Sequence, residues 1–260
     1  MPDHNSNAAT PLQPRRRAIL IGSAQGLGAA LARRLAREGY LLGLADRNGE
    51  LLNKICAEIN QSGSHAQAIP YIHDVTATDE IPALLQKMMT DLGGLDLFIY
   101  DAGILLPTTP TTYEFEKDRR MMEVNALGAM AWFNVVAPVF QALQAGQIVG
   151  ISSVAADRGR VGNPGYNASK AALATYLEAL RNRLTRFGVH VLTVKPGFMD
   201  TEMLKSSPRT FWVASPEKAA DDIWKAIKHR KQTIYTLSRW GLIMLIIKHI
   251  PSIIFRRLSF

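Results

Sequence analysis

The chain has 260 residues, 47% of them hydrophobic, which is enough to build one domain of ordinary length around a full core. Its single cysteine, Cys56, excludes an internal disulfide framework and suits a reducing compartment, and no cluster of Cys and His suggests a metal site. The net charge of +8 would suit a nucleic-acid-binding protein. No nucleic-acid motif is present, however, and the C-terminal residues fit another partner better.

The first 14 residues are polar, contain prolines and lack the apolar run of a signal peptide, so we expect a disordered tail over 1–14. Arg15, Arg16 and Arg17 lead from this tail into the first strand. They are compatible with a solvated strand entry, and also with attraction to phosphate or to a membrane.

Short apolar runs alternate with amphipathic segments along the rest of the chain. The runs predict strands near 18–21, 40–45, 66–71, 96–100, 147–151, 189–194 and 232–236. The amphipathic segments predict helices near 27–38, 49–62, 78–92, 113–144 with a break around 120, 165–187 and 215–230. This order predicts an α/β fold, a Rossmann-type doubly wound parallel sheet of about seven strands in a single domain, whose ligands sit beyond the carboxyl ends of the strands.

A glycine-rich turn from Gly22 to Gly28 joins the first strand to the first helix. Its glycines permit a tight turn and a close approach of the backbone to a ligand. A strand, a glycine turn and a helix N-terminus together set backbone N–H groups against a pyrophosphate, so the segment favours dinucleotide binding.

Asp46 and Arg47 end the second strand. A carboxylate at this place accepts hydrogen bonds from a ribose 2′-hydroxyl and repels a 2′-phosphate, so Asp46 favours NAD, with NADP as the alternative because Arg47 could pair with a phosphate. A purely structural reading is that Asp46 caps the second helix.

Ser153, Tyr166 and Lys170 form the candidate catalytic group. Tyr166 and Lys170 are four residues apart, so on a helix they share one face. An ammonium beside a phenol favours the phenolate, and a serine hydroxyl from a separate strand can polarise the same substrate oxygen. The three residues therefore predict proton transfer to or from an alcohol or a carbonyl.

The chain resembles the short-chain dehydrogenase/reductase family over roughly residues 16–236. The matching residues occur in the family's order and near its spacing: Gly22, Gly26 and Gly28; Asp74-Val75; Ala102-Gly103; Asn125; Ser153; Tyr166 with Lys170; and Pro196-Gly197 followed by Thr201.

The resemblance implies that Tyr166 is the general acid/base, that Lys170 lowers its pKa and holds the nicotinamide ribose, and that Ser153 orients the substrate oxygen. It implies that Asn125 positions a water and Lys170 in a proton relay. The alternative is that Asn125 is a core residue whose amide is only hydrogen-bonded to the backbone. Asp74 would bond the adenine, or simply form a turn before Thr76. The full set implied for the cofactor is Gly22, Ser23, Gln25, Gly26, Leu27, Gly28, Asp46, Arg47, Asp74, Val75, Ala102, Gly103, Tyr166, Lys170, Pro196, Gly197, Met199 and Thr201.

The chain departs from the family's pattern in two places. Ile21 precedes the first glycine, where the family usually has Thr, and Tyr100-Asp101 replaces Asn-Asn before Ala102-Gly103. An ionised Asp101 accepts hydrogen bonds but cannot donate them, which puts the bonding between sheet and loop at this point in doubt.

Residues 202–214 are expected to form a lid with an apolar tip, which suggests a substrate with hydrocarbon bulk. Arg158 and Arg160 lie between Ser153 and Tyr166, where they would be solvated loop residues or contacts for an anionic substrate group. These features place the dinucleotide-binding and catalytic domain at 15–237.

The C-terminal tail, 238–260, contains two apolar runs, 240–247 and 250–255, with basic residues around them. The first run is far shorter than the ~20 residues of a membrane span, and Pro251 breaks the helix. Such a segment suits the surface of an anionic membrane, or packs on its own domain or on a second subunit.

These observations predict an oxidoreductase that interconverts a secondary alcohol and a ketone, with an apolar or lipid-like substrate. The alternatives are an NADPH-dependent 3-oxoacyl reductase, whose carrier's acidic surface could face Arg158 and Arg160, and a dinucleotide-sensing scaffold without turnover. We expect a cytoplasmic protein, peripheral on the membrane if the tail binds lipid. A homodimer or homotetramer would associate through the helices near 113–144 and 165–187.

Overall fold

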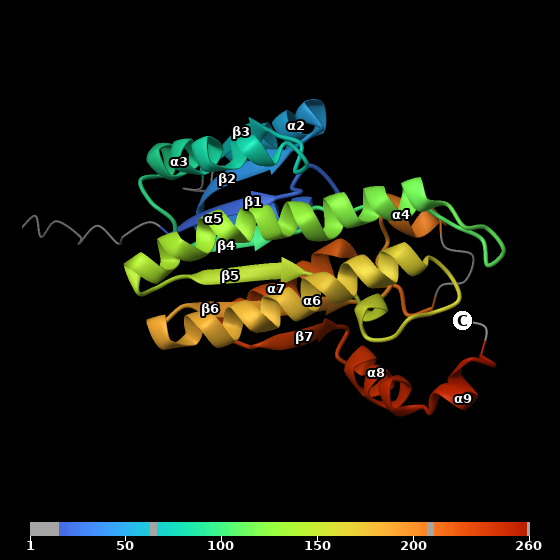
Figure 1. The fold of residues 1–260 in the computed structure, drawn as a ribbon. Coiled ribbons are helices and arrows are strands. Elements are labelled where there is room, and N and C mark those ends of the chain that lie inside the picture. Colours follow the sequence, from blue (N-terminus) through green and yellow to red (C-terminus); the bar gives the residue numbers. More distant parts are fainter. Residues whose placement is uncertain (1–15, 63–66, 207–210, 259–260) are drawn as a thin grey trace, which may run out of the picture.

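The computed structural model describes residues 16–62, 67–206 and 211–258, so the expected disorder of residues 1–14 falls outside the described part of the chain. Its centre is a parallel seven-stranded sheet in the order β3-β2-β1-β4-β5-β6-β7 (Figure 1). The predicted doubly wound sheet is therefore confirmed. The strands are β1 Arg17–Ile21, β2 Leu41–Asp46, β3 Gln67–Ile72, β4 Leu97–Tyr100, β5 Gln147–Ile151, β6 His190–Pro196 and β7 Thr233–Thr236.

Helices cover both faces of the sheet, which is why the central strands are continuous apolar runs rather than alternating ones. One face packs against α1 Gly26–Arg37, α2 Gly49–Gln61 and α7 Pro216–Lys228. The other packs against α3 Ile81–Leu92, α5 Gly128–Leu143 and α6 Pro164–Leu184. Each predicted strand and helix up to residue 236 occurs within a few residues of its expected bounds.

The helix predicted over 113–144 is interrupted a few residues later than expected. It consists of α4 Phe115–Met122, a π-helical turn at Glu123–Leu127 and then α5. The Tyr100 hydroxyl donates a hydrogen bond of 2.7 Å to the carbonyl of Val124, inside this turn. A side chain bonded to a helical carbonyl is a recognised companion of such an irregularity.

The same continuous helix, Phe115–Leu143, is the one helix of the described residues that is long and apolar enough to cross a membrane. Its apolar side contributes Trp132, Phe133 and Phe140, all fully buried, to the core beneath the sheet. Packing against the sheet accounts for its hydrophobicity.

Two further helices, α8 Arg239–His249 and α9 Ser252–Phe255, follow β7 and lie together beyond its end (Figure 1). Pro251 lies between them, as the sequence predicts, because a proline cannot continue the hydrogen-bond ladder of α8. One side of α8 is buried against the domain through Trp240 and Met244.

Candidate active site at the carboxyl ends of the strands

A cavity of about 1200 Å³ opens beyond the carboxyl ends of the central strands. The glycine turn, the loops after β2 to β6 and the start of α6 contribute its walls, and α8 closes one side. Among the described residues, no group of three or more His, Cys, Asp or Glu side chains is placed to hold a metal ion.

The glycine turn is shaped by close contacts between backbone atoms. Gly22 has a φ of +88°, and a Cβ added there would lie 2.5 Å from the backbone nitrogen of Ala102. A Cβ on Gly28 would lie 1.9 Å from the carbonyl oxygen of Gly22. The side chain of Gln25, the residue before α1, does not cap the helix, and of the first-turn N–H groups that of Gly28 is bound by the Asp101 carboxylate. This cradle fits the pyrophosphate of a dinucleotide.

Asp46 and Arg47 both line the cavity at the end of β2. The Asp46 carboxylate accepts hydrogen bonds of 3.0 Å from the backbone N–H groups of Ala24 and Asn48. Asn48, and not Asp46, caps α2, because its side chain accepts the N–H of Leu51. The carboxylate is thus held in a fixed position between the glycine turn and the start of α2.

Asp74 follows β3 and lines the cavity together with Val75. One of its carboxylate oxygens accepts hydrogen bonds from the backbone N–H and the hydroxyl of Thr76, so the turn expected before Thr76 does form. The other oxygen lies 3.5 Å from a guanidinium nitrogen of Arg120. The Thr76 hydrogen bonds, aided by Arg120, lower the pKa of Asp74.

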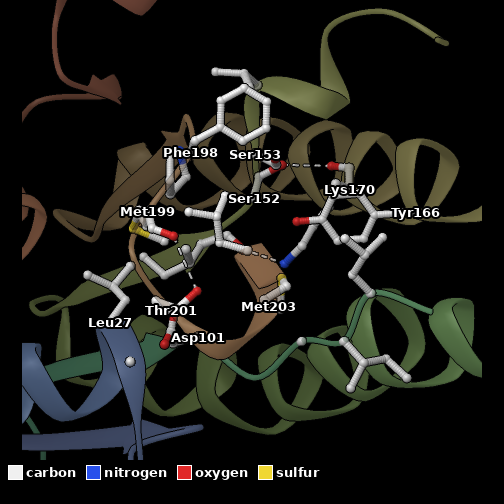
Figure 2. Close-up of a pocket in the computed structure, with 18 of the residues that line it drawn as sticks. Leu27, Asp101, Ser152, Ser153, Tyr166, Lys170, Phe198, Met199, Thr201 and Met203 are labelled. Atoms are coloured by element: carbon white, nitrogen blue, oxygen red, sulfur yellow. Dashed lines mark hydrogen bonds between the residues drawn. The ribbon is translucent and has the colours of Figure 1, made fainter. Parts of the chain in front are cut away.

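Ser153, Tyr166 and Lys170 meet at the centre of the cavity, the serine from the loop after β5 and the other two from α6 (Figure 2). Ser152 turns away and donates a hydrogen bond of 2.8 Å to the backbone carbonyl of Lys170. The Lys170 ammonium donates to the carbonyl of Ile151 at 2.9 Å and lies 6.0 Å from the centre of the Tyr166 ring.

The electrostatics of these residues differ from the expectation that Lys170 lowers the pKa of Tyr166. Desolvation raises the pKa of the phenol, opposed by its hydrogen bond with Ser153 and by the charge of Arg160. Burial lowers the pKa of Lys170 to about 8, opposed by the charge of Asp101. The cation that opposes the rise in the pKa of Tyr166 is therefore Arg160.

Asn125 lies in the π-helical turn behind the cavity wall and is fully buried. Its side-chain amide donates to the carbonyl of Ile104 and to the hydroxyl of Ser169, and its oxygen accepts the N–H of Ile104 at 2.7 Å. A Cβ on Gly103 would lie 3.3 Å from the Asn125 amide oxygen and 3.1 Å from the Lys170 ammonium. Asn125 thus fixes the loop after β4 against α6, close to Lys170.

The remaining predicted cofactor residues fall into two groups. The larger group lines the cavity and consists of Gln25, Gly26, Leu27, Ala102, Gly103, Pro196, Gly197, Met199 and Thr201. Ser23 is buried, and its hydroxyl donates to the carbonyl of Ala45, so it supports the glycine turn from behind.

The loop after β6 returns on itself at the substrate end of the cavity. Met199 forms a bridge with Ala214, which closes the segment between them; residues 207–210 of the expected lid lie outside the described residues. Phe198 and Phe211 contact each other and Trp240 of α8, with ring centres 5.2–5.8 Å apart. The apolar tip of this segment therefore packs on the C-terminal tail, beside the cavity.

Arg158 is half-buried, and its guanidinium is engaged by the C-terminal tail. Its guanidinium donates to the backbone carbonyls of Ile247, Lys248 and Ile250 at 2.7–3.1 Å and stacks over Phe255, with its central carbon 4.2 Å from the ring centre. It caps the C-terminus of α8, where cations are favoured. Of the two arginines singled out in this loop, Arg160 is the one whose charge acts on the pKa of Tyr166.

Comparisons with known proteins identify the family of the chain. The family model described as short chain dehydrogenase matches residues 16–211. The chain belongs to the short-chain dehydrogenase family. It is accordingly an oxidoreductase that acts on CH–OH groups with NAD or NADP.

A curated relative, ketoacyl reductase HetN of Nostoc sp., is 31% identical over 217 residues, which are 82% of this chain and 75% of that protein. A solved short-chain dehydrogenase/reductase from Burkholderia phymatum in complex with NAD has a TM-score of 0.80 at 21% identity, covering 89% of this chain and 92% of that one. ElxO with NADP bound has a TM-score of 0.77 at 19% identity, covering 85% and 97%. Both structures share the fold.

The departure of this short-chain dehydrogenase at Tyr100-Asp101 leaves the backbone bonding intact. The N–H groups of Asp101 and Ala102 both donate to the carbonyl of Ile21, at 2.9 and 3.1 Å. The Asp101 carboxylate accepts the backbone N–H of Gly28, in the first turn of α1. Burial nevertheless raises the pKa of Asp101 to about 7, although the charge of Lys170 and the Gly28 hydrogen bond oppose the shift.

Asp101→Asn is expected to make the thermal stability of the enzyme less dependent on pH. A carboxyl whose pKa is higher folded than unfolded destabilises the fold increasingly as the pH rises from about 4, its unfolded pKa, to about 7. The melting temperature of the wild type should therefore fall relative to that of the variant over this range. Calorimetry at a series of pH values measures the difference, and two parallel curves would contradict a raised pKa at Asp101.

The wall of the cavity also includes Trp240, Met244 and Ile247, which were not predicted from the sequence. Their spacing of four and three residues, which puts them on one side of α8, was the available signal. A Cβ on Gly197 would lie 2.0 Å from the indole nitrogen of Trp240, so the glycine after β6 makes room for this side chain.

Proposed function

We propose that the enzyme reduces the ketone of an acyl-chain substrate of the 3-oxoacyl class to a secondary alcohol. The observation that carries the proposal is the apolar part of the cavity wall, because Phe198, Trp240, Met244 and Ile247 line the same cavity as Ser153 and Tyr166. An acyl chain fits such a wall, because burial of its methylenes is favourable. The name of the relative HetN, a ketoacyl reductase, supports the same class of substrate.

The proton chemistry follows from three side chains. Ser153 donates a hydrogen bond to the substrate oxygen and holds it beside the phenol of Tyr166. Tyr166 gives its proton to that oxygen as negative charge develops there, and accepts it back in the oxidative direction. The charge of Arg160 opposes the rise in the pKa of Tyr166 and so favours the phenolate that remains. A bound nicotinamide supplies or accepts the hydride.

The residues around the cavity fit a nicotinamide dinucleotide. The N-terminus of α1 and the glycine turn would hold the pyrophosphate. Asp46 would bind the adenine ribose, Asp74 the adenine, and Lys170 the nicotinamide ribose. The loop after β6 lies across the glycine turn, since a Cβ on Gly26 would be 3.3 Å from Thr201 Cγ2. Thr201 and the backbone of Met199 are thereby in reach of a carboxamide.

Asp46 supports a preference for NAD over NADP. Its carboxylate is fixed by two backbone N–H groups, so it cannot easily turn away from a 2′-phosphate. Asp46→Ala should reduce the ratio of kcat/KM for NADH over NADPH by about tenfold, the effect of removing roughly one charge–charge or charged hydrogen-bond interaction. Steady-state kinetics with both cofactors give the ratio, and an unchanged ratio would exclude this role.

The 3-oxoacyl proposal is separated from a general secondary-alcohol dehydrogenase by two substrates of equal carbon number. One is a 3-oxoacyl thioester, and the other is a plain methyl ketone without the thioester group. A 3-oxoacyl reductase should show the higher kcat/KM with the thioester. Equal kcat/KM values, or a higher value for the plain ketone, would instead favour a general dehydrogenase of apolar secondary alcohols.

Self-association through α4–α5 and α6 remains a proposal. The exposed apolar side chains Tyr113, Phe115 and Leu127 at the start of that surface support it. Light scattering of the purified protein measures the mass directly, and a monomer over the working concentration range would rule it out.

A further inference from the structure

The helix α8 has two apolar sides with different surroundings. Its inner side, with Trp240 and Met244, is buried against Phe198 and Tyr235 and lines the cavity. Its outer side carries Leu242, Leu245 and Ile246, whose exposed fractions are 66%, 57% and 61%. Their spacing of three and four residues forms one stripe along the helix.

The short helix α9 and the residues after it add to this exposed surface. Ile253 and Ile254 are 60% and 52% exposed, and Leu258 is 36% exposed. We call the six side chains together the outer face: Leu242, Leu245, Ile246, Ile253, Ile254 and Leu258. Large apolar side chains gathered on one exposed element indicate an interaction surface.

The charge of the chain is concentrated around the outer face. Residues 223–260 contain eight Lys and Arg and no Asp or Glu, while the whole chain has a net charge of +8. The first 222 residues are therefore electrically balanced, with 22 basic and 22 acidic side chains. Arg239, Lys248, Arg256 and Arg257, which flank the outer face, are all exposed.

We propose that the outer face of α8–α9 docks on the surface of an anionic lipid bilayer. Apolar side chains flanked by cations are complementary to acyl chains beneath negatively charged headgroups. A second copy of this chain is a poorer occupant, because it would bring two strongly basic segments together. A span is excluded by length, since the 11 residues of α8 extend about 16 Å against a hydrocarbon core of about 30 Å.

The tail is fastened to the catalytic domain, so docking would orient the whole enzyme. Arg158, in the loop between Ser153 and Tyr166, holds three backbone carbonyls at the end of α8 and the ring of Phe255. The neighbouring Asp157 binds Lys195 of β6 and accepts the hydroxyl of Tyr235 on β7, and Lys248 lies 3.8 Å from it. A surface bound to lipid is thus joined directly to the active-site loop.

Docking would also bring the apolar end of the cavity to the bilayer, because opposite sides of α8 form the outer face and the cavity wall. An acyl-chain substrate would then have only a short path between the lipid and the cavity; this part rests on the proposed function. The docking itself does not, since it depends on exposed side chains remote from Ser153 and Tyr166.

Co-sedimentation of the full-length protein with vesicles tests the proposal. Vesicles of phosphatidylcholine alone are compared with vesicles that also contain phosphatidylglycerol, at low and high salt. The wild type should bind the anionic vesicles and lose affinity in salt. Leu245→Ser with Ile246→Ser should weaken binding by about tenfold or more through lost apolar burial, and Arg256→Glu with Arg257→Glu should weaken it mainly at low salt.

Leu143→Ser is the matched control, because Leu143 is 55% exposed at the end of α5, outside the outer face. It should bind like the wild type. Docking is overturned if the wild type ignores anionic vesicles, or if the Leu245/Ile246 variant binds unchanged. It is also overturned if that variant changes only the mass measured by light scattering, which would identify a contact between copies.

Turnover of a short, water-soluble ketone without vesicles should be the same in the wild type and the Leu245/Ile246 variant. This readout separates the two proposals. Vesicle binding without turnover of any carbonyl would leave docking supported and reject the proposed function. Turnover of a ketone without vesicle binding would reject docking and leave the proposed function supported.

Discussion

Tyr166→Phe is expected to abolish turnover while dinucleotide binding persists. The phenyl ring keeps the volume of the side chain, so the cavity wall and the packing of α6 stay in place. Only the hydroxyl that exchanges a proton with the substrate oxygen, and its hydrogen bond with Ser153, are lost. General acid–base catalysis contributes about 10²–10⁴-fold to rate, and kcat should fall by a factor in this range.

Ketone-dependent oxidation of the reduced cofactor measures the loss, and titration calorimetry measures binding of the dinucleotide. Tyr113→Phe is the matched control, because Tyr113 is 94% exposed and should tolerate the same change without effect. A Tyr166→Phe enzyme with a kcat within a few fold of the wild type would mean that another group handles the proton.

Gly28→Ala is expected to disable the dinucleotide site. The added Cβ would lie 1.9 Å from the carbonyl oxygen of Gly22 and 3.0 Å from a carboxylate oxygen of Asp101. The nearest of these atoms is backbone, so the turn itself must move. A displacement of about 1 Å in a positioned group can cost on the order of 10²-fold in rate, and we expect a loss of this size in kcat/KM for the cofactor.

The control for this change is Gly159→Ala, because a Cβ at Gly159 meets nothing within 4 Å. Circular dichroism and thermal unfolding show whether the Gly28 variant keeps its fold. A folded Gly28→Ala enzyme that binds and uses the dinucleotide as the wild type does would contradict the assignment of this turn.

The fold could be predicted from the sequence because its signals are local. Each buried strand is a run of neighbouring apolar residues, such as Ala18 to Ile21, and each helix repeats its apolar residues over short intervals. The spacing of Tyr166 and Lys170 is equally local. Their nearness to Ser153 follows from the topology of a parallel sheet, in which strand ends meet at one edge.

Contacts between distant segments could not be predicted in the same way. Arg158 binds carbonyls 89 to 92 residues away, and no pattern around it distinguishes such a clamp from a solvated loop residue. The pKa of Tyr166 depends on desolvation and on Arg160, which are properties of the assembled cavity. The role of Trp240 in the cavity wall depends on how α8 folds back after β7.

We expect this cavity to reduce the ketone of an apolar substrate by using a nicotinamide dinucleotide. The most direct measurement is the rate of NADH and NADPH oxidation with 3-oxoacyl substrates of increasing chain length. Turnover should favour NADH, and kcat/KM should rise as the chain lengthens, because the chain is buried against Phe198 and Trp240. Tight dinucleotide binding with no turnover of any carbonyl would contradict it, and would point to a dinucleotide-sensing protein instead.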